Sequence, residues 1–125
     1  MKKEARIAPR NSLILVMDKT VGEVPKSMNK ALVAATPSCV AVGTLSEYDG
    51  ETLISLSDGA LPSSAALSLV FEGVLKTPAR ELSLCSVLDE TILTLDVPTD
   101  NTRVQIWANA DAEPDEVHVV ATEGT

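Results

Sequence analysis

Hydrophobic and polar residues alternate along most of this chain, and a period of two is typical of a β-strand with one buried face. Eight segments show either this alternation or a short apolar run: 13–18, 39–45, 52–57, 66–75, 81–85, 93–97, 103–109 and 116–121. Polar turn residues separate these segments at roughly the 8–12-residue spacing expected of a sandwich or barrel. We therefore predict an all-β fold, an antiparallel β-sandwich of about eight strands with one short helix.

The helix is predicted at the one segment that departs from the strand pattern. Residues 25–35 contain a candidate N-cap at Ser27, good helix-forming residues and no helix breaker before Pro37. We expect this helix to cross an end or an edge of the sheets.

Two glycines mark expected irregularities. The dipeptide Asp49-Gly50 supplies the positive φ angle of a tight turn, so residues 39–57 are expected to fold as a β-hairpin. Gly73 interrupts the strand at 66–75 and is expected to mark a β-bulge there.

Length and composition indicate a single domain. The chain has 125 residues, 45% of them hydrophobic but only 2% aromatic, so aliphatic side chains must form the core. Residues 12–125 are expected to form one β-sandwich, and residues 1–11, which are polar and basic, a flexible N-terminal arm. The longest apolar run near the start, 13–17, is too short for a membrane span or a signal peptide, which favours the cytoplasm.

Charge is divided unevenly along the sequence. Residues 1–30 hold seven of the ten Lys and Arg residues against three acids, a net charge of +4. Residues 31–125 hold three bases against fifteen acids, a net charge of −12. The acidic part repels nucleic acid phosphates and anionic membranes, so we expect neither as a partner. The same charge attracts basic proteins, and a basic protein partner is therefore expected.

No motif for a cofactor, a metal or a catalytic site is present in the sequence. Its six glycines are scattered and form no phosphate-binding loop, and one histidine with two distant cysteines is too few for a usual zinc site. Cys39 and Cys85 either form one disulfide or remain buried thiols, and a cytosolic chain favours the thiols. We therefore predict a protein that is not an enzyme and needs no cofactor.

The segments 103–109 and 116–121 carry the first candidate site. If they pair as a hairpin, the face opposite the aliphatic one carries six side chains: Arg103, Gln105, Trp107, Asn109, Glu116 and His118. Trp and Arg often dominate interface energies, so this face is a candidate partner-binding patch. The alternative is that Trp107 packs against a neighbouring loop or the helix. No motif places a serine or cysteine beside His118, which is therefore expected to be a surface residue without a catalytic role.

An acidic loop between these two segments is the second candidate site. It contains Asp111, Glu113 and Asp115, and Glu116 follows at the start of the next strand. Spaced acids suit calcium, but Pro114 and the absence of the required glycine and terminal glutamate break the EF-hand pattern. Two other interpretations stay open: a solvated acidic loop, and a phosphate-like surface that binds a basic partner.

The order of segments supplies a family resemblance over residues 12–121. A helix-like stretch ends at Ala34-Ala35, the 39–57 segment follows, and later strands include Leu95-Asp96-Val97-Pro98 and the Trp-bearing strand at 103–107. This architecture resembles the small competence protein J family, inhibitors of a DNA-entry nuclease. The resemblance implies a non-enzymatic inhibitor or immunity-type protein that binds a nuclease, and it assigns a role to no individual residue.

Charge and resemblance together favour a protein-binding module that uses the acidic loop, with Trp107 as an anchor, against a basic partner such as a nuclease or toxin. The first alternative is a homo-oligomeric structural or adaptor protein, a homodimer for example, that buries the Trp107 face against a second copy. The second alternative is an enzymatic or ligand-binding role in a sandwich cavity, for which the sequence places no pair of carboxylates beside a nucleophile.

Overall fold

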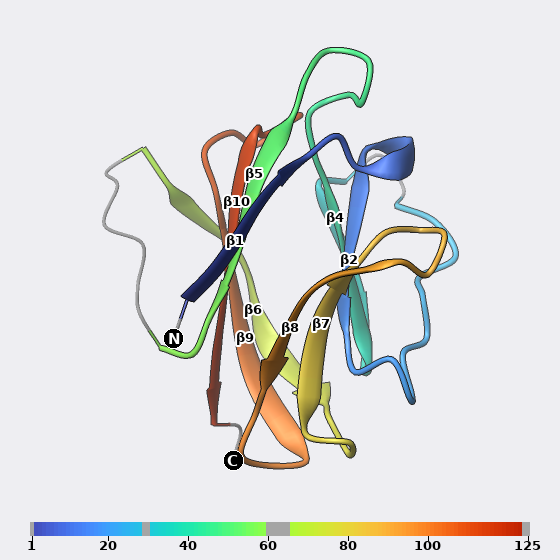
Figure 1. Cartoon of the computed structure of the whole chain (residues 1–125), viewed down its shortest axis with the longest axis vertical. Coiled ribbons are helices and arrows are strands. Elements are labelled where there is room, and N and C mark those ends of the chain that lie inside the picture. The colour runs from blue at the N-terminus through green and yellow to red at the C-terminus, as the bar shows by residue number, and fades with distance from the viewer. Residues whose placement is uncertain (1, 29–30, 60–65, 124–125) are drawn as a thin grey trace.

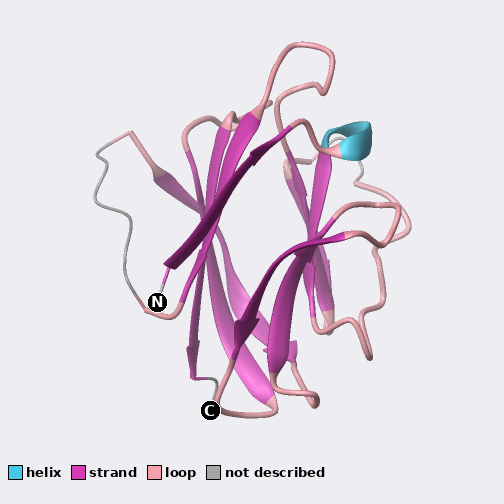
Figure 2. Cartoon of the chain, viewed as in Figure 1, coloured by secondary structure: helices cyan, strands magenta, loops and turns pink. Residues whose placement is uncertain are grey.

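Two β-sheets face each other in the computed structural model, which describes residues 2–28, 31–59 and 66–123 (Figure 1). The described part of the chain forms ten strands and one 3₁₀ turn: β1 (Lys2–Ile7), η1 (Arg10–Ser12), β2 (Leu13–Met17), β3 (Val33–Thr36), β4 (Cys39–Gly43), β5 (Thr52–Ser57), β6 (Ser68–Lys76), β7 (Glu81–Cys85), β8 (Thr91–Asp96), β9 (Asn101–Ala108) and β10 (Glu116–Glu123). In Figure 2, strands and loops make up nearly all of the described chain. The predicted all-β sandwich is confirmed. No helix among the described residues is long and apolar enough to cross a membrane.

Each sheet contains five strands. Sheet A has the order β1-β5-β10-β9-β6, and sheet B has the order β3-β4-β2-β7-β8. Neighbouring strands are antiparallel, with the exception of β5 and β10, which run parallel. The hairpin expected from residues 103–109 and 116–121 is present as β9 and β10.

Aliphatic side chains fill the space between the sheets. Along β9, Val104, Ile106 and Ala108 are buried, while the residues between them are half-buried, as the alternation in the sequence predicted. Ile54 of β5 and Leu84 of β7 are fully buried in the same core. Each such side chain contributes on the order of 1.5–3 kcal/mol through the apolar surface it removes from water.

The helix predicted for residues 25–35 is wrong where the structure describes this segment. Residues 25–28 are not helical, residues 29–30 lie outside the described residues, and Val33–Thr36 form strand β3. β3 pairs with β4, and these tertiary hydrogen bonds outweigh the weak local preference of alanine-rich sequence for a helix. Met28 packs instead against a buried cluster on the outer face of sheet B: Leu15, Met17, Cys39, Ala41 and Cys85.

The hairpin predicted for residues 39–57 is also wrong. β4 belongs to sheet B and β5 to sheet A, so residues 44–51 cross from one sheet to the other. Gly50 does adopt a positive φ of 147°, but within this crossing loop. The bulge expected at Gly73 lies instead between Leu69 and Phe71.

The N-terminal segment differs from the predicted flexible arm. Lys2–Ile7 form β1, the edge strand of sheet A, which pairs with β5 from Lys2 opposite Ser57 to Ile7 opposite Thr52. Ala5 and Ile7 pack against the core while Lys2, Glu4 and Arg6 are exposed. Lys2 and Arg6 therefore lie on the solvent side of an ordinary alternating strand, whereas Lys3 shares the half-buried side with Ala5 and Ile7.

The two cysteines are buried free thiols. They lie on β4 and β7, on either side of β2, with Cys39 opposite Met17 and Cys85 opposite Leu15. Burial, with a smaller contribution from Cys85, raises the pKa of the Cys39 thiol to about 12. Burial also raises the pKa of Cys85.

We expect neither thiol to react with 5,5′-dithiobis(2-nitrobenzoic acid) in the folded protein at about pH 8, because the thiolate is the reactive form. The folded pKa of Cys39 lies above its ordinary value of 9.0, so its contribution to stability is complete below pH 9 and is lost as the pH rises toward 12. The thermal unfolding temperature should therefore fall as the pH rises from 9 toward 12. The fall should be smaller in a Cys39→Ala variant. Rapid labelling of the folded protein at pH 8 would contradict the expectation.

Candidate functional site

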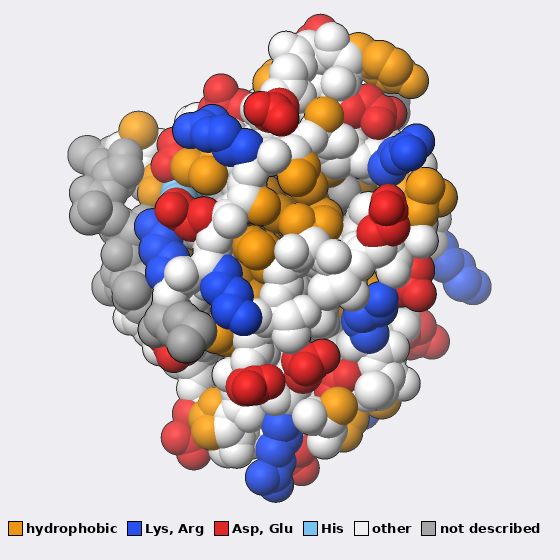
Figure 3. Space-filling view, in the orientation of Figure 1, with side chains coloured by type: hydrophobic (Ala, Val, Ile, Leu, Met, Phe, Trp, Pro, Cys, Tyr) orange, Lys and Arg blue, Asp and Glu red, His pale blue; other side chains and the backbone are white. Residues whose placement is uncertain are grey.

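The predicted acidic loop lies at one end of the sandwich, beside the crossing loop between β4 and β5 (upper end in Figure 1). We define the acidic end as residues 44–51 together with residues 109–116. These two segments contain seven acids and no Lys or Arg: Glu47, Asp49, Glu51, Asp111, Glu113, Asp115 and Glu116. Five of them are exposed, and Glu47 and Glu116 are half-buried. Figure 3 shows Asp and Glu side chains around this end of the molecule.

Backbone hydrogen bonds hold the two loops of the acidic end together. The Leu45 amide donates to the Pro114 carbonyl and the Leu53 amide to the Asp115 carbonyl, each at 2.8 Å. Within the second loop, the Asn109 side-chain amide donates to Asp115 Oδ1 at 2.5 Å. The first loop is also tied to η1, because the Glu47 amide donates to Ser12 Oγ at 3.2 Å. The carboxylates therefore project from a braced surface.

One aromatic side chain stands among these acids. Tyr48 is 90% exposed, the largest exposed fraction of any large hydrophobic side chain in the described residues. Its backbone is held by the turn in which the Asp49 amide donates to the Ser46 carbonyl at 2.9 Å. An exposed tyrosine on a fixed turn has the size and rigidity of an interface anchor. Sequence analysis missed Tyr48, Glu47 and Glu51 because the local signal was interpreted only as a turn.

The Trp107 face is present but differs in part from the prediction. Trp107 lies directly opposite His118 on β10 and Leu69 on β6, and it is half-buried. Its indole Nε1 is buried and has no hydrogen-bond partner among the described residues. Arg103 lies four residues along β9, about 14 Å away at the ordinary rise of a strand, and faces Thr122. Arg103 is therefore not brought to the acidic end.

His118 is not the surface residue that was expected, since it is only 6% exposed. Its Nδ1 lies 2.5 Å from Ser55 Oγ, and its Nε2 lies 2.8 Å from Glu116 Oε1. The parallel pairing of β5 and β10 places Ser55 directly opposite His118. Only this long-range pairing reveals Ser55, which is 63 residues away in the sequence.

The Ser55–His118–Glu116 chain has the connectivity of a nucleophile, a base and an orienting carboxylate. Ser55, however, is only 2% exposed, so its hydroxyl is buried. The arrangement instead satisfies a buried imidazole on both ring nitrogens and fixes the Glu116 carboxylate at the base of the acidic end.

We expect Ser55→Ala to lower the free energy of unfolding by about 1–2 kcal/mol, because it leaves the buried His118 Nδ1 without its partner. Thr52 is the matched control on the same strand, since its buried Oγ1 has no hydrogen-bond partner among the described residues. Thr52→Val should be neutral or stabilising by up to about 1 kcal/mol. Urea unfolding of both variants makes the comparison, and equal destabilisation would refute the assignment.

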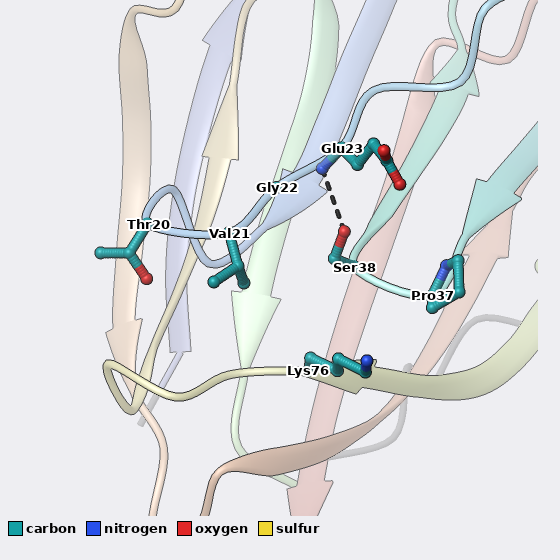
Figure 4. A pocket seen from close by; sticks show the side chains of 7 residues that line it. All are labelled: Thr20, Val21, Gly22, Glu23, Pro37, Ser38 and Lys76. Atoms are coloured by element: carbon teal, nitrogen blue, oxygen red, sulfur yellow. Dashed lines mark hydrogen bonds between the residues drawn. The ribbon is translucent and has the colours of Figure 1, made fainter.

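A shallow cavity of about 610 Å³ lies near the opposite end (Figure 4). Its lining comes from the segment after β2, the turn between β3 and β4, and the end of β6: Thr20, Val21, Gly22, Glu23, Pro37, Ser38 and Lys76. The Glu23 amide donates to Ser38 Oγ at 3.0 Å, so part of its polar lining is already satisfied. No group of three or more His, Cys, Asp or Glu side chains among the described residues is arranged to hold a metal ion.

Comparisons with known proteins place this sandwich in a structural class. No protein-family model and no curated protein sequence matches the chain. Among solved structures, the fold is similar to that of ComJ from Bacillus subtilis, the inhibitor of the DNA-degrading activity of NucA, with a TM-score of 0.71 and 11% identity over 98% of this chain and 96% of that one. It is also similar to the product of crocagin biosynthetic gene J, with a TM-score of 0.56 and 10% identity over 99% and 96% of the two chains. The architectural resemblance noted from the order of segments is thus confirmed at the level of the fold.

Proposed function

We propose that this protein is a non-enzymatic binding module that uses its acidic end to occupy the nucleic-acid groove of a basic partner, most specifically a nuclease. The observation that carries the proposal is the gathering of seven acids and no base on two loops that brace each other. Asp111, Glu113 and Asp115 remain the predicted binding residues, and Tyr48 replaces Trp107 as the anchor because it is the aromatic residue with a free surface.

The physical basis is complementarity of charge. A nuclease holds DNA by placing basic side chains against phosphates, and a rigid array of carboxylates presents the same sign of charge to those side chains. The attraction also raises the rate of encounter. Because the loops are already fixed by hydrogen bonds, little conformational entropy is lost when the partner binds.

Similarity of fold supports the choice of a nuclease. ComJ is an inhibitor of NucA, and this chain has the fold of ComJ along nearly its whole length. The free buried thiols are compatible with the reducing environment of the cytoplasm, where we propose that the protein acts.

The proposal is tested by measuring association with purified NucA, the nuclease that ComJ inhibits, as the probe. We expect an association rate that falls at least about tenfold between roughly 50 and 500 mM salt, and competition between this protein and duplex DNA for the nuclease. An association rate that does not change with salt, or a nuclease that binds both ligands at once, would contradict the proposal.

A further inference from the structure

The two sheets do not close completely along the side where β1 and β8 meet. β1 is an edge strand of sheet A and β8 is an edge strand of sheet B, and they run across the front of the view in Figure 1. Lys3 Nζ bridges them by donating to the Thr94 carbonyl at 2.5 Å. Nearer the Ile7 end, the edges leave a groove of about 450 Å³ between Ile7, Pro9 and Arg10 on one wall and Glu90, Thr91 and Ile92 on the other.

The floor of this groove is apolar. Ile7 and Ile92 pack against the hydrophobic core but are only partly buried, and Ala5 and Leu93 share this environment. Figure 3 shows hydrophobic side chains open to solvent in the middle of this face, with charged side chains around them. Apolar core surface that remains in contact with water is a favourable place for a partner's apolar side chain.

One base lines the groove on the β1 side. Arg10 is exposed, and it forms no ion pair within the described part of the chain. Glu90 is the single acid of the lining, and it accepts a hydrogen bond from Ser86 Oγ at 3.3 Å. The groove therefore joins an apolar floor to one guanidinium group without an ion pair, in a protein whose formal net charge is −8. A guanidinium group binds a carboxylate through two parallel hydrogen bonds.

We propose that this groove docks an extended segment of a partner protein in which apolar and acidic side chains alternate. An apolar side chain of the segment lies between Ile7 and Ile92, and a neighbouring carboxylate pairs with Arg10. The edge strands favour an extended occupant because each has backbone amide and carbonyl groups on its outer side for pairing with another strand. This surface borders the acidic end, because the Thr44 amide donates to the carbonyl of Ser12, two residues after Arg10, at 2.9 Å.

The test uses a displayed library of random decapeptides, selected on the purified protein at physiological salt. We expect enrichment of peptides in which Asp or Glu adjoins an aliphatic or aromatic residue. Individual peptides should lose at least about tenfold in affinity for Arg10→Glu, because a carboxylate then meets a carboxylate. Ile92→Thr, which keeps a β-branched side chain in the strand, should weaken the same peptides.

Lys26→Glu is the matched control, because it makes the same change of charge on an exposed residue outside the groove. The proposal for the groove would be overturned if peptides bound the Arg10→Glu variant as tightly as the original protein. It would also be overturned if no peptide combining acidic and apolar residues were enriched. Enrichment of basic peptides alone would also overturn it and would leave the proposed function of the acidic end intact. Arg10 is exposed, so its variant remains informative even where Ile92→Thr alters folding.

Discussion

Neutralising Asp111, Glu113 and Asp115 together should slow association with a basic nuclease by about ten- to a hundredfold at low salt. The three carboxylates are exposed on one braced loop, so their fields add at the surface that the partner approaches. The substitutions Asp111→Asn, Glu113→Gln and Asp115→Asn keep the size of each side chain. The Asp115→Asn change retains a side-chain oxygen that accepts the hydrogen bond from Asn109. Stopped-flow or surface-binding kinetics against NucA measure the rate.

The matched control removes three exposed acids elsewhere, through Glu81→Gln, Asp96→Asn and Glu123→Gln. Both triple variants change the net charge by the same amount, so only the position of the charge differs. We expect the control to associate within about threefold of the original protein at moderate salt, where charges beyond about 10 Å are screened. Equal slowing of both variants would show that overall charge, and not the acidic end, governs the encounter.

Substituting Tyr48 tests the proposed anchor separately from the charges of the acidic end, with the same kinetic measurement. Its removal in Tyr48→Ala leaves every charge in place, so the association rate should change little while dissociation accelerates by about tenfold. Trp107→Phe is the comparison for the anchor that the sequence suggested, and it should leave both rates nearly unchanged.

Replacing Asp18 by alanine should lower the free energy of unfolding by about 3 kcal/mol, roughly a hundredfold in the folding equilibrium. Asp18 is 1% exposed and accepts three hydrogen bonds. Oδ1 accepts from the Thr20 amide at 2.9 Å and the Thr20 hydroxyl at 2.7 Å, and Oδ2 accepts from the Ala79 amide at 2.8 Å. These bonds connect the end of β2 to the turn between β6 and β7.

The cost arises because Asp18→Ala leaves those donors without an acceptor in a site closed to solvent. Asp18→Asn keeps one oxygen acceptor and should lose about half as much stability. Asp96→Ala, at an exposed position, is the control and should change stability by less than about 0.5 kcal/mol. Urea unfolding gives all three values, and an Asp18→Ala protein as stable as the control would disprove the structural role of this carboxylate.

The acidic end and the groove beside β1 give this protein two neighbouring surfaces of different character. Six of the seven acids of the acidic end lie on loops and Glu116 begins β10, whereas the bases Lys2, Lys3 and Arg6 lie on an edge strand. β1, at the border of sheet A, carries three of the seven bases found in residues 1–30.

Alternation of residue type was sufficient to predict the later strands, because a strand with one buried face has an apolar residue at every second position. Val104, Ile106 and Ala108 show this on β9, and the acids of the loop that follows were predicted from the same stretch of sequence. The aliphatic composition likewise predicted a sandwich core with few aromatic side chains. These features depend on neighbours within a few residues, so they need no knowledge of the rest of the fold.

Features that join distant segments appeared only in the folded chain. β1 became a strand by pairing with β5, and residues 33–36 paired with β4 although their local preference favoured a helix. Glu47 and Tyr48 lie beside the acidic loop because residues 44–51 cross between the sheets. Ser55 contacts His118 because β5 and β10 pair in parallel. Which strands pair depends on the total burial and hydrogen bonding of two complete sheets. A short stretch of sequence contains only a few of these contacts.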